Sequence, residues 1–99
     1  MLIRITAEGV AVEDIEVLDR LSAVVAPGVE AGDALRSAGA GDLVDDDHIR
    51  VHTAFVRAAA VDAAVGEEWD ARFSSMLAYA ATKGWVHEQP EGLIAHIER

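Results

Sequence analysis

The stretch from Gly66 to Val86 constrains the fold most, because it has the spacing of an amphipathic helix. Its apolar residues fall at i, i+4, i+7, i+8 and i+11, on one side of a helix: Trp69, Phe73, Met76, Leu77 and Ala80. Acidic residues crowd its first turn and Lys83 lies in its last turn, as the helix dipole favours. Gly84 suits the left-handed residue that ends a helix. We therefore predict a helix over Glu67 to Lys83 whose apolar stripe faces the core.

Length and composition predict one small domain, residues 1–99. The chain has 99 residues, of which 52% are hydrophobic and only 5% aromatic, so a core of small side chains is expected. The absence of cysteine excludes disulfides, thiolate metal sites and cysteine nucleophiles. No apolar run reaches membrane-spanning length, and the N-terminus lacks the pattern of a signal peptide. These features predict a cytoplasmic protein with no membrane association.

The charge balance limits the classes of partner. Eighteen acidic and 8 basic residues give a formal net charge of −10. Phosphate contacts need a basic face, so binding to nucleic acid or to an anionic membrane is not expected. A basic partner, a cation or a solvated acidic surface fits the charge.

The first quarter of the chain predicts a strand followed by a helix. Leu2 to Thr6 alternates in apolar character, which is typical of a strand, and we expect an edge strand or an N-terminal strand here. Val12 to Val25 has apolar residues at helical spacing, and Pro27 stops the pattern. A strand over residues 15–18 is the alternative.

The middle of the chain predicts a loose segment followed by a long helix. Residues 27–47 are rich in glycine, with a possible short helix over Val29 to Ala38 that ends at Gly39. The aspartates at 45–47 fit the N-terminus of a helix that runs to about Val65. This helix and the one after Gly66 then form a helical hairpin.

The last segment predicts a β-hairpin. Residues 88–92 are rich in turn-forming residues, and the positions of Leu93, Ala95 and Ile97 alternate with those of Ile94, His96 and Glu98. A final helix that starts at Pro90 is the alternative. The expected fold is therefore a helix-dominated α+β domain: an N-terminal strand, an amphipathic helix, a helical hairpin and a C-terminal β-hairpin.

A helix that ends in Gly-Trp-Val and is followed by a hairpin resembles the second half of a winged helix-turn-helix domain. The resemblance covers Glu67 to Glu98 and lies in the order of the elements. It implies that Glu67 to Lys83 is a recognition helix. The acidic first turn of this helix would repel phosphate, so a winged-helix shape used for protein contact fits better than one used for DNA.

Two kinds of candidate site residue stand out. His48 and His52 are spaced i,i+4, which on a helix would let both bind one zinc ion, with Asp45 or Asp47 close enough to add a carboxylate. The pattern lacks the third ligand and the glutamate of a helical metalloprotease motif. Aromatic residues anchor many interfaces, and four are candidates here: Trp69, Phe73, Tyr79 and Trp85.

No catalytic set can be assembled from the remaining polar residues. Ser74 and Ser75 lie in mid-helix without an adjacent base, and His87 and His96 do not come opposite each other in the expected hairpin. The sequence thus favours a non-catalytic, self-associating interaction or accessory domain with no cofactor and a protein partner. The alternatives are a winged-helix transcriptional regulator and a small metal-binding or enzymatic protein that uses His48 and His52.

Overall fold

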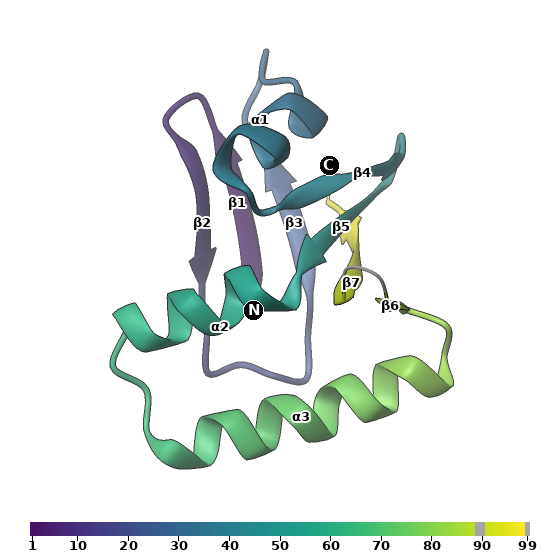
Figure 1. Ribbon diagram of the computed structural model, residues 1–99. Helices are drawn as coiled ribbons and strands as arrows, with labels where there is room; N and C mark the ends of the chain where they lie inside the picture. The colour runs from purple at the N-terminus through teal and green to yellow at the C-terminus, as the bar shows by residue number, and fades with distance from the viewer. Residues whose placement is uncertain (89–90, 99) are drawn as a thin grey trace.

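The computed structural model describes residues 1–88 and 91–98. In this part of the chain, one curled sheet and three helices enclose a single core (Figure 1). The strands are β1 (Leu2–Thr6), β2 (Gly9–Glu13), β3 (Ser22–Val25), β4 (Gly41–Asp45), β5 (His48–His52), β6 (Val86–Glu88) and β7 (Glu91–Ile97). The helices are α1 (Ala31–Ala38), α2 (Thr53–Asp62) and α3 (Glu67–Thr82).

The sheet, and not a helical hairpin, is the framework of the molecule. Its strand order is β2-β1-β3-β7-β5-β4, and β6 pairs with β7 beside this path. β1 pairs with β3, and β3 with β7, in parallel, whereas the other pairs are antiparallel. The prediction of a helix-dominated fold is therefore wrong, since strands and helices take similar shares of the chain.

The core lies between one face of the sheet and the helices. Its largest fully buried side chains come from β1, β5, β7 and all three helices: Phe73, Ile3, Ile5, Leu35, Ile49, Leu93, Val51 and Val56. Figure 1 shows α1 near one end of the sheet and α2 and α3 near the other. No helix in the described residues has both the length and the apolar character that are needed to cross a membrane.

Residues 12–25 do not form the predicted amphipathic helix. Gly9 adopts φ 140° and allows a tight turn, so β2 folds back on β1 with Val10 opposite Ile5. β1 then lies between β2 and β3 rather than at an edge. Ile15, Leu18 and Leu21 have helical spacing but pack against the core from a loop that also replaces the alternative strand over 15–18. Pairing with neighbouring strands has overridden the local periodicity.

The predicted long helix over 45–65 begins instead as a strand. In β5, Ile49 and Val51 are fully buried while His48, Arg50 and His52 are only partly buried, which is a strand alternation. The aspartates at 45–47 form the β4–β5 turn, in which the Asp45 carboxylate accepts a hydrogen bond from the Asp47 N–H at 2.8 Å. Only the second half of the predicted helix, α2, is helical.

The segment predicted to be loose contains two ordered elements. α1 agrees with the expected short helix, because Leu35 is fully buried and Gly39, at φ 67°, follows it. β4 was not anticipated: Gly41 begins it and packs against β5. A Cβ atom there would lie 1.8 Å from the Arg50 carbonyl oxygen, so only glycine fits.

The predicted C-terminal hairpin is present, but it is not a wing. β6 pairs with β7, and Leu93, Ala95 and Ile97 are buried as expected. Residues 89 and 90, which include the tip of the predicted turn and the start of the alternative helix at Pro90, lie outside the described residues. β7 also pairs with β5 from His52 to His48, so it lies inside the sheet and the winged-helix element order does not hold.

α3 has nearly the predicted bounds. It joins α2 through residues 63–66, and Ala64 adopts φ 54° there. Arg57 of α2 pairs with Asp70 of α3, and its guanidinium lies 5.0 Å from the centre of the Phe73 ring. α2 and α3 are thus neighbours, but both serve to close the core of the sheet.

Candidate functional site

A cleft opens where β7 changes its pairing partner. On one edge, β7 pairs with β6 at residues 91–93 and with β3 at residues 96–97. Between these stretches the Ile94 N–H donates to the Trp85 carbonyl at 2.8 Å, just before β6 begins. The chain leading into β3 and the chain leading into β6 therefore diverge here and leave a seam in the sheet.

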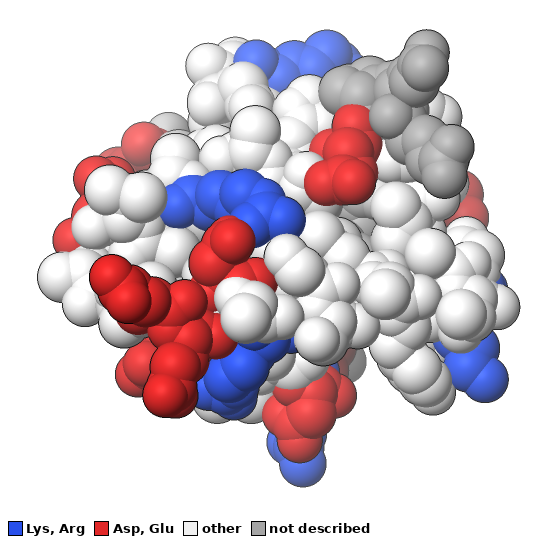
Figure 2. Space-filling model, turned by 60° about the horizontal axis from the view of Figure 1, so that its bottom comes forward, with Lys and Arg blue, Asp and Glu red and all other residues white. Residues whose placement is uncertain are grey.

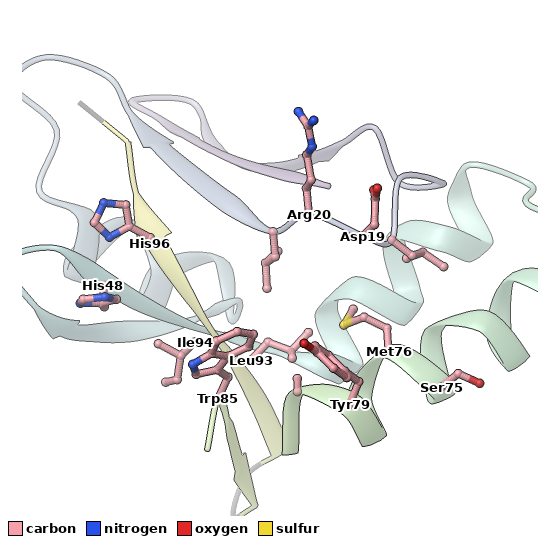
Figure 3. A pocket seen from close by; sticks show the side chains of 13 residues that line it. Asp19, Arg20, His48, Ser75, Met76, Tyr79, Trp85, Leu93, Ile94 and His96 are labelled. Carbon is pink, nitrogen blue, oxygen red and sulfur yellow. The ribbon is translucent and has the colours of Figure 1, made fainter. Parts of the chain in front are cut away.

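The cleft at this seam has a volume of about 690 Å³, which is within the usual range for small-molecule pockets. Its walls come from the loop before β3, the C-terminal half of α3, Trp85 and the strands β5 and β7. The lining residues are Leu18, Asp19, Arg20, Leu21, His48, Ser75, Met76, Tyr79, Ala80, Trp85, Leu93, Ile94 and His96. We call this site the aromatic cleft (Figure 3).

The loop that forms one wall of the cleft is fixed at both sides. The Met1 amino group donates hydrogen bonds to the carbonyls of Val17 at 2.6 Å and Arg20 at 2.8 Å. Burial lowers the pKa of this amino group. The Trp69 indole N–H donates to the Ile15 carbonyl at 2.7 Å. The leucines at 18 and 21 are therefore held against the core as part of a built wall.

Tyr79 and Trp85 form the opposite, aromatic wall. Trp85 is brought back toward α3 because its backbone N–H donates to the Ala80 carbonyl at 3.0 Å and Gly84 adopts φ 76°. The two rings meet edge to face, with centroids 6.5 Å apart and an interplanar angle of 71°. Tyr79 is 60% exposed and Trp85 49% exposed. Large apolar surfaces of this kind are the usual anchors of interfaces and ligand sites.

Two histidines form the polar end of the cleft. His48 and His96 occupy paired positions on β5 and β7, and their ring centroids are 5.2 Å apart. His48 Nδ1 lies 2.9 Å from a carboxylate oxygen of Asp45. This contact with His48 is the main cause that lowers the pKa of Asp45, and the hydrogen bond from the Asp47 N–H adds to it. The chain of contacts fixes the orientation of the His48 ring.

Several polar atoms at the cleft have no partner among the described residues. Within residues 1–88 and 91–98, no hydrogen bond reaches the indole nitrogen of Trp85, the hydroxyl of Tyr79 or the ring nitrogens of His96. In Figure 3 the indole nitrogen of Trp85 lies on the ring edge that faces the two histidines. The cleft therefore combines an apolar interior with free hydrogen-bonding groups at one end.

The four interface candidates fall into two pairs. Trp69 is 4% exposed and Phe73 fully buried, and their rings stack with centroids 4.7 Å apart. These two side chains belong to the core. Tyr79 and Trp85 are exposed and line the aromatic cleft. The structure thus places only the second pair where a partner can reach it.

The two candidate zinc ligands are not brought together. His48 and His52 lie on the same face of β5, but four residues along a strand separate them by about 13 Å. The helical spacing on which the metal prediction rested is therefore absent. Among the described residues, no group of three or more metal-binding side chains could hold an ion.

The other polar candidates are also separated. His87 lies opposite Gly92, whereas His96 lies opposite His48. Ser75 lines the cleft but lies far from the histidine end in Figure 3, and Ser74 is not among the lining residues. No described serine and histidine in the cleft therefore form a nucleophile and base pair.

Sequence reasoning missed His96, Leu18 and Leu21 as members of one site with Trp85. These residues are far apart in the chain and meet only through the pairing of β3 and β6 with β7. The alternation over residues 93–98 did carry one signal, since it put His96 on the face opposite Leu93 and Ile97.

Charge is distributed unevenly over the helix beside the cleft. Figure 2 shows red and blue side chains gathered toward the left of this face and a broad white area toward the right. Along α3, the charged residues end at Arg72, and residues 73–82 carry no charge.

Searches with the chain against protein-family models, curated proteins and solved structures found no match.

Proposed function

We propose that this chain is a non-catalytic protein-interaction domain that associates with a second copy of itself. The surface is the uncharged face of α3, defined by Ser74, Ser75, Ala78, Tyr79, Ala81 and Thr82, together with Trp85 beside it. The observation that carries the proposal is the charge-free second half of α3, with the exposed ring of Tyr79 on it and that of Trp85 just after it, in a protein of net charge −10.

Electrostatics favours this face over the rest of the surface. Two copies of an acidic protein repel each other, and the repulsion is smallest where neither copy presents carboxylates. The first half of α3 carries Glu67, Glu68 and Asp70, whereas the second half carries no acid. A two-fold arrangement that pairs the second halves of α3 keeps the acidic turns apart.

Side-chain chemistry favours the same face. Ala78 and Ala81 are small and exposed, so two helices can approach closely there. Tyr79 and Trp85 can bury large apolar areas at little cost in side-chain entropy, which is typical of interface anchors.

Sedimentation equilibrium over a wide range of protein concentration tests the proposal. We expect the wild-type chain to approach the mass of a dimer and Ala78→Glu to remain a monomer, because the new carboxylate faces its symmetry mate. Val61→Glu is the matched control: Val61 is 78% exposed on α2, away from this face. Its variant should self-associate as the wild type does.

A monomeric wild-type protein at the highest concentration reached would end the proposal. Equal loss of association in Ala78→Glu and Val61→Glu would also contradict it, because the effect would then follow total charge and not position. Circular dichroism and the unfolding midpoint of each variant establish that the fold is kept.

Other parts of the sequence-based interpretation remain predictions. A cytoplasmic setting fits the lack of cysteine, and the acidic surface still argues against nucleic acid as the partner. The exposed part of the α3 first turn is acidic, so it offers phosphate no basic contact.

A further inference from the structure

We propose that the aromatic cleft is a binding site for a small apolar carboxylic acid, whose body lies between Leu21, Met76 and Trp85 and whose carboxylate lies at the histidine end and meets His96. This inference concerns the interior of the cleft. It goes beyond the proposed self-association, although the cleft and the uncharged face of α3 share Tyr79 and Trp85.

The interior fits an apolar body. The cavity of about 690 Å³ is large enough for a drug-sized molecule, and leucine, isoleucine, methionine and aromatic side chains dominate its walls. Asp19 and Arg20 also border the cleft, but in Figure 3 their side chains point away from Tyr79 and Trp85.

The histidine end fits an acceptor head group. The indole N–H of Trp85 can only donate a hydrogen bond, and an imidazole ring of His96 carries at least one N–H. Neither has a partner within the described part of the chain. A carboxylate carries only acceptor oxygens, so it matches donors of this kind.

The polar end is also held in place before any ligand arrives. The Asp47 N–H fixes the Asp45 carboxylate, and that carboxylate fixes His48 through Nδ1. His48 in turn packs against the His96 ring, with an interplanar angle of 67°. Pre-organised polar groups in an apolar pocket are what distinguishes a ligand site from a surface depression.

Nuclear magnetic resonance gives a direct test, because the chain has two indole N–H groups. The full chain is titrated with phenylbutyrate, with octanoate and with the uncharged analogue phenylbutyramide. We expect saturable shifts of the Trp85 indole signal with an acid, while the Trp69 signal, held by the Ile15 carbonyl, stays in place. The two acids distinguish an aromatic body from an acyl chain.

Two variants locate the head group. His96→Ala should weaken binding of the acid by about tenfold, the equivalent of one hydrogen bond. His52→Ala is the matched control, because His52 lies on the neighbouring strand and on the same face but outside the described lining of the cleft. It should leave binding unchanged. His96 is exposed, so the variant should fold, and the unchanged Trp69 signal verifies this.

The outcomes separate clearly. The proposal is supported if either acid binds saturably, if the amide analogue binds more weakly than its acid, and if His96→Ala weakens binding of the acid. If neither acid shifts the Trp85 signal, the site does not exist. Equal affinity for phenylbutyrate and phenylbutyramide, or equal effects of His96→Ala and His52→Ala, would show that the histidine end does not recognise a carboxylate.

Discussion

The two ends of α3, together with the residues just after it, use the same kinds of side chain for opposite purposes. In the first half, Trp69 and Phe73 are buried and stacked, and the Trp69 indole N–H is bonded to the Ile15 carbonyl. At the other end, Tyr79 and Trp85 are exposed, and the described residues offer their polar atoms no partner. The first pair fixes a loop to the core, and the second pair leaves an aromatic surface open.

The difference follows from the position of each residue around the helix axis. At 3.6 residues per turn, Tyr79 lies about 80° from Trp69 and about 120° from Phe73. It therefore leaves the apolar stripe, while Ala80 continues that stripe and is buried. An aromatic residue on the stripe serves the core, and one beside the stripe is available for binding.

The largest expected effect that would test this comparison comes from Phe73. Phe73→Ala should lower the free energy of unfolding by about 3–5 kcal/mol, because it leaves a cavity in the core and removes the ring under Arg57. Tyr79→Ala should change it by less than about 0.5 kcal/mol. Urea unfolding followed by circular dichroism measures both, and similar losses would contradict the assignment of the two halves.

The next largest expected effect is a difference in stability loss between substitutions of the two tryptophans. Trp69→Phe should cost about 1–2 kcal/mol, because the Ile15 carbonyl loses its buried donor. Trp85→Phe should cost less than about 0.5 kcal/mol. Acrylamide quenching provides an independent check: emission should resist quenching in Trp85→Phe and be strongly quenched in Trp69→Phe. The reverse pattern would show that the buried and exposed rings had been exchanged.

The smallest expected effect on stability concerns an ion pair outside α3, that of Asp42 and Arg50. Arg50 donates from Nε to Asp42 at 2.8 Å and lowers the pKa of that carboxyl below its ordinary value of 3.8. A lowered pKa in the folded state adds stability above that ordinary value, and the gain is lost as the pH falls through the folded pKa.

The measurement compares wild type and Asp42→Asn in urea. The variant should be less stable by a few tenths to about 1 kcal/mol near pH 7, since the pair is partly solvent-exposed, and the difference should shrink near pH 3. A difference that does not change with pH would mean that the charge of Asp42 contributes nothing. Variants of Tyr79 and Trp85 should show no such dependence.

The sequence predicted elements whose apolar residues follow one regular pattern. α3, β1 and the alternation of β7 could be read from spacing because each buries one regular stripe. β2, β4 and β5 could not, since their strand conformation depends on partners elsewhere in the chain. The residues of β5 follow both a helical and a strand pattern, and only pairing with β7 decides between them.

The candidate site shows the same limit. Trp85 was identified from its position after Gly84, at the end of the helix. Its neighbours in the cleft were not, because Leu18, Leu21 and His96 approach it only when β3 and β6 pair with the same edge of β7. The spacing of residues along the chain does not indicate where two strands that are distant in sequence diverge in the sheet.

The position of β7 has a consequence for how the chain folds. β7 joins the unit of β1, β2 and β3 to the hairpin of β4 and β5, and it pairs Ser22 with His96 across most of the sequence. Neither unit can complete the sheet alone, so the sheet is complete only when the last strand has paired with both. Because such distant pairing demands costly loop closure, its formation should limit the folding rate, and a nascent chain should complete its core only once β7 has left the ribosome.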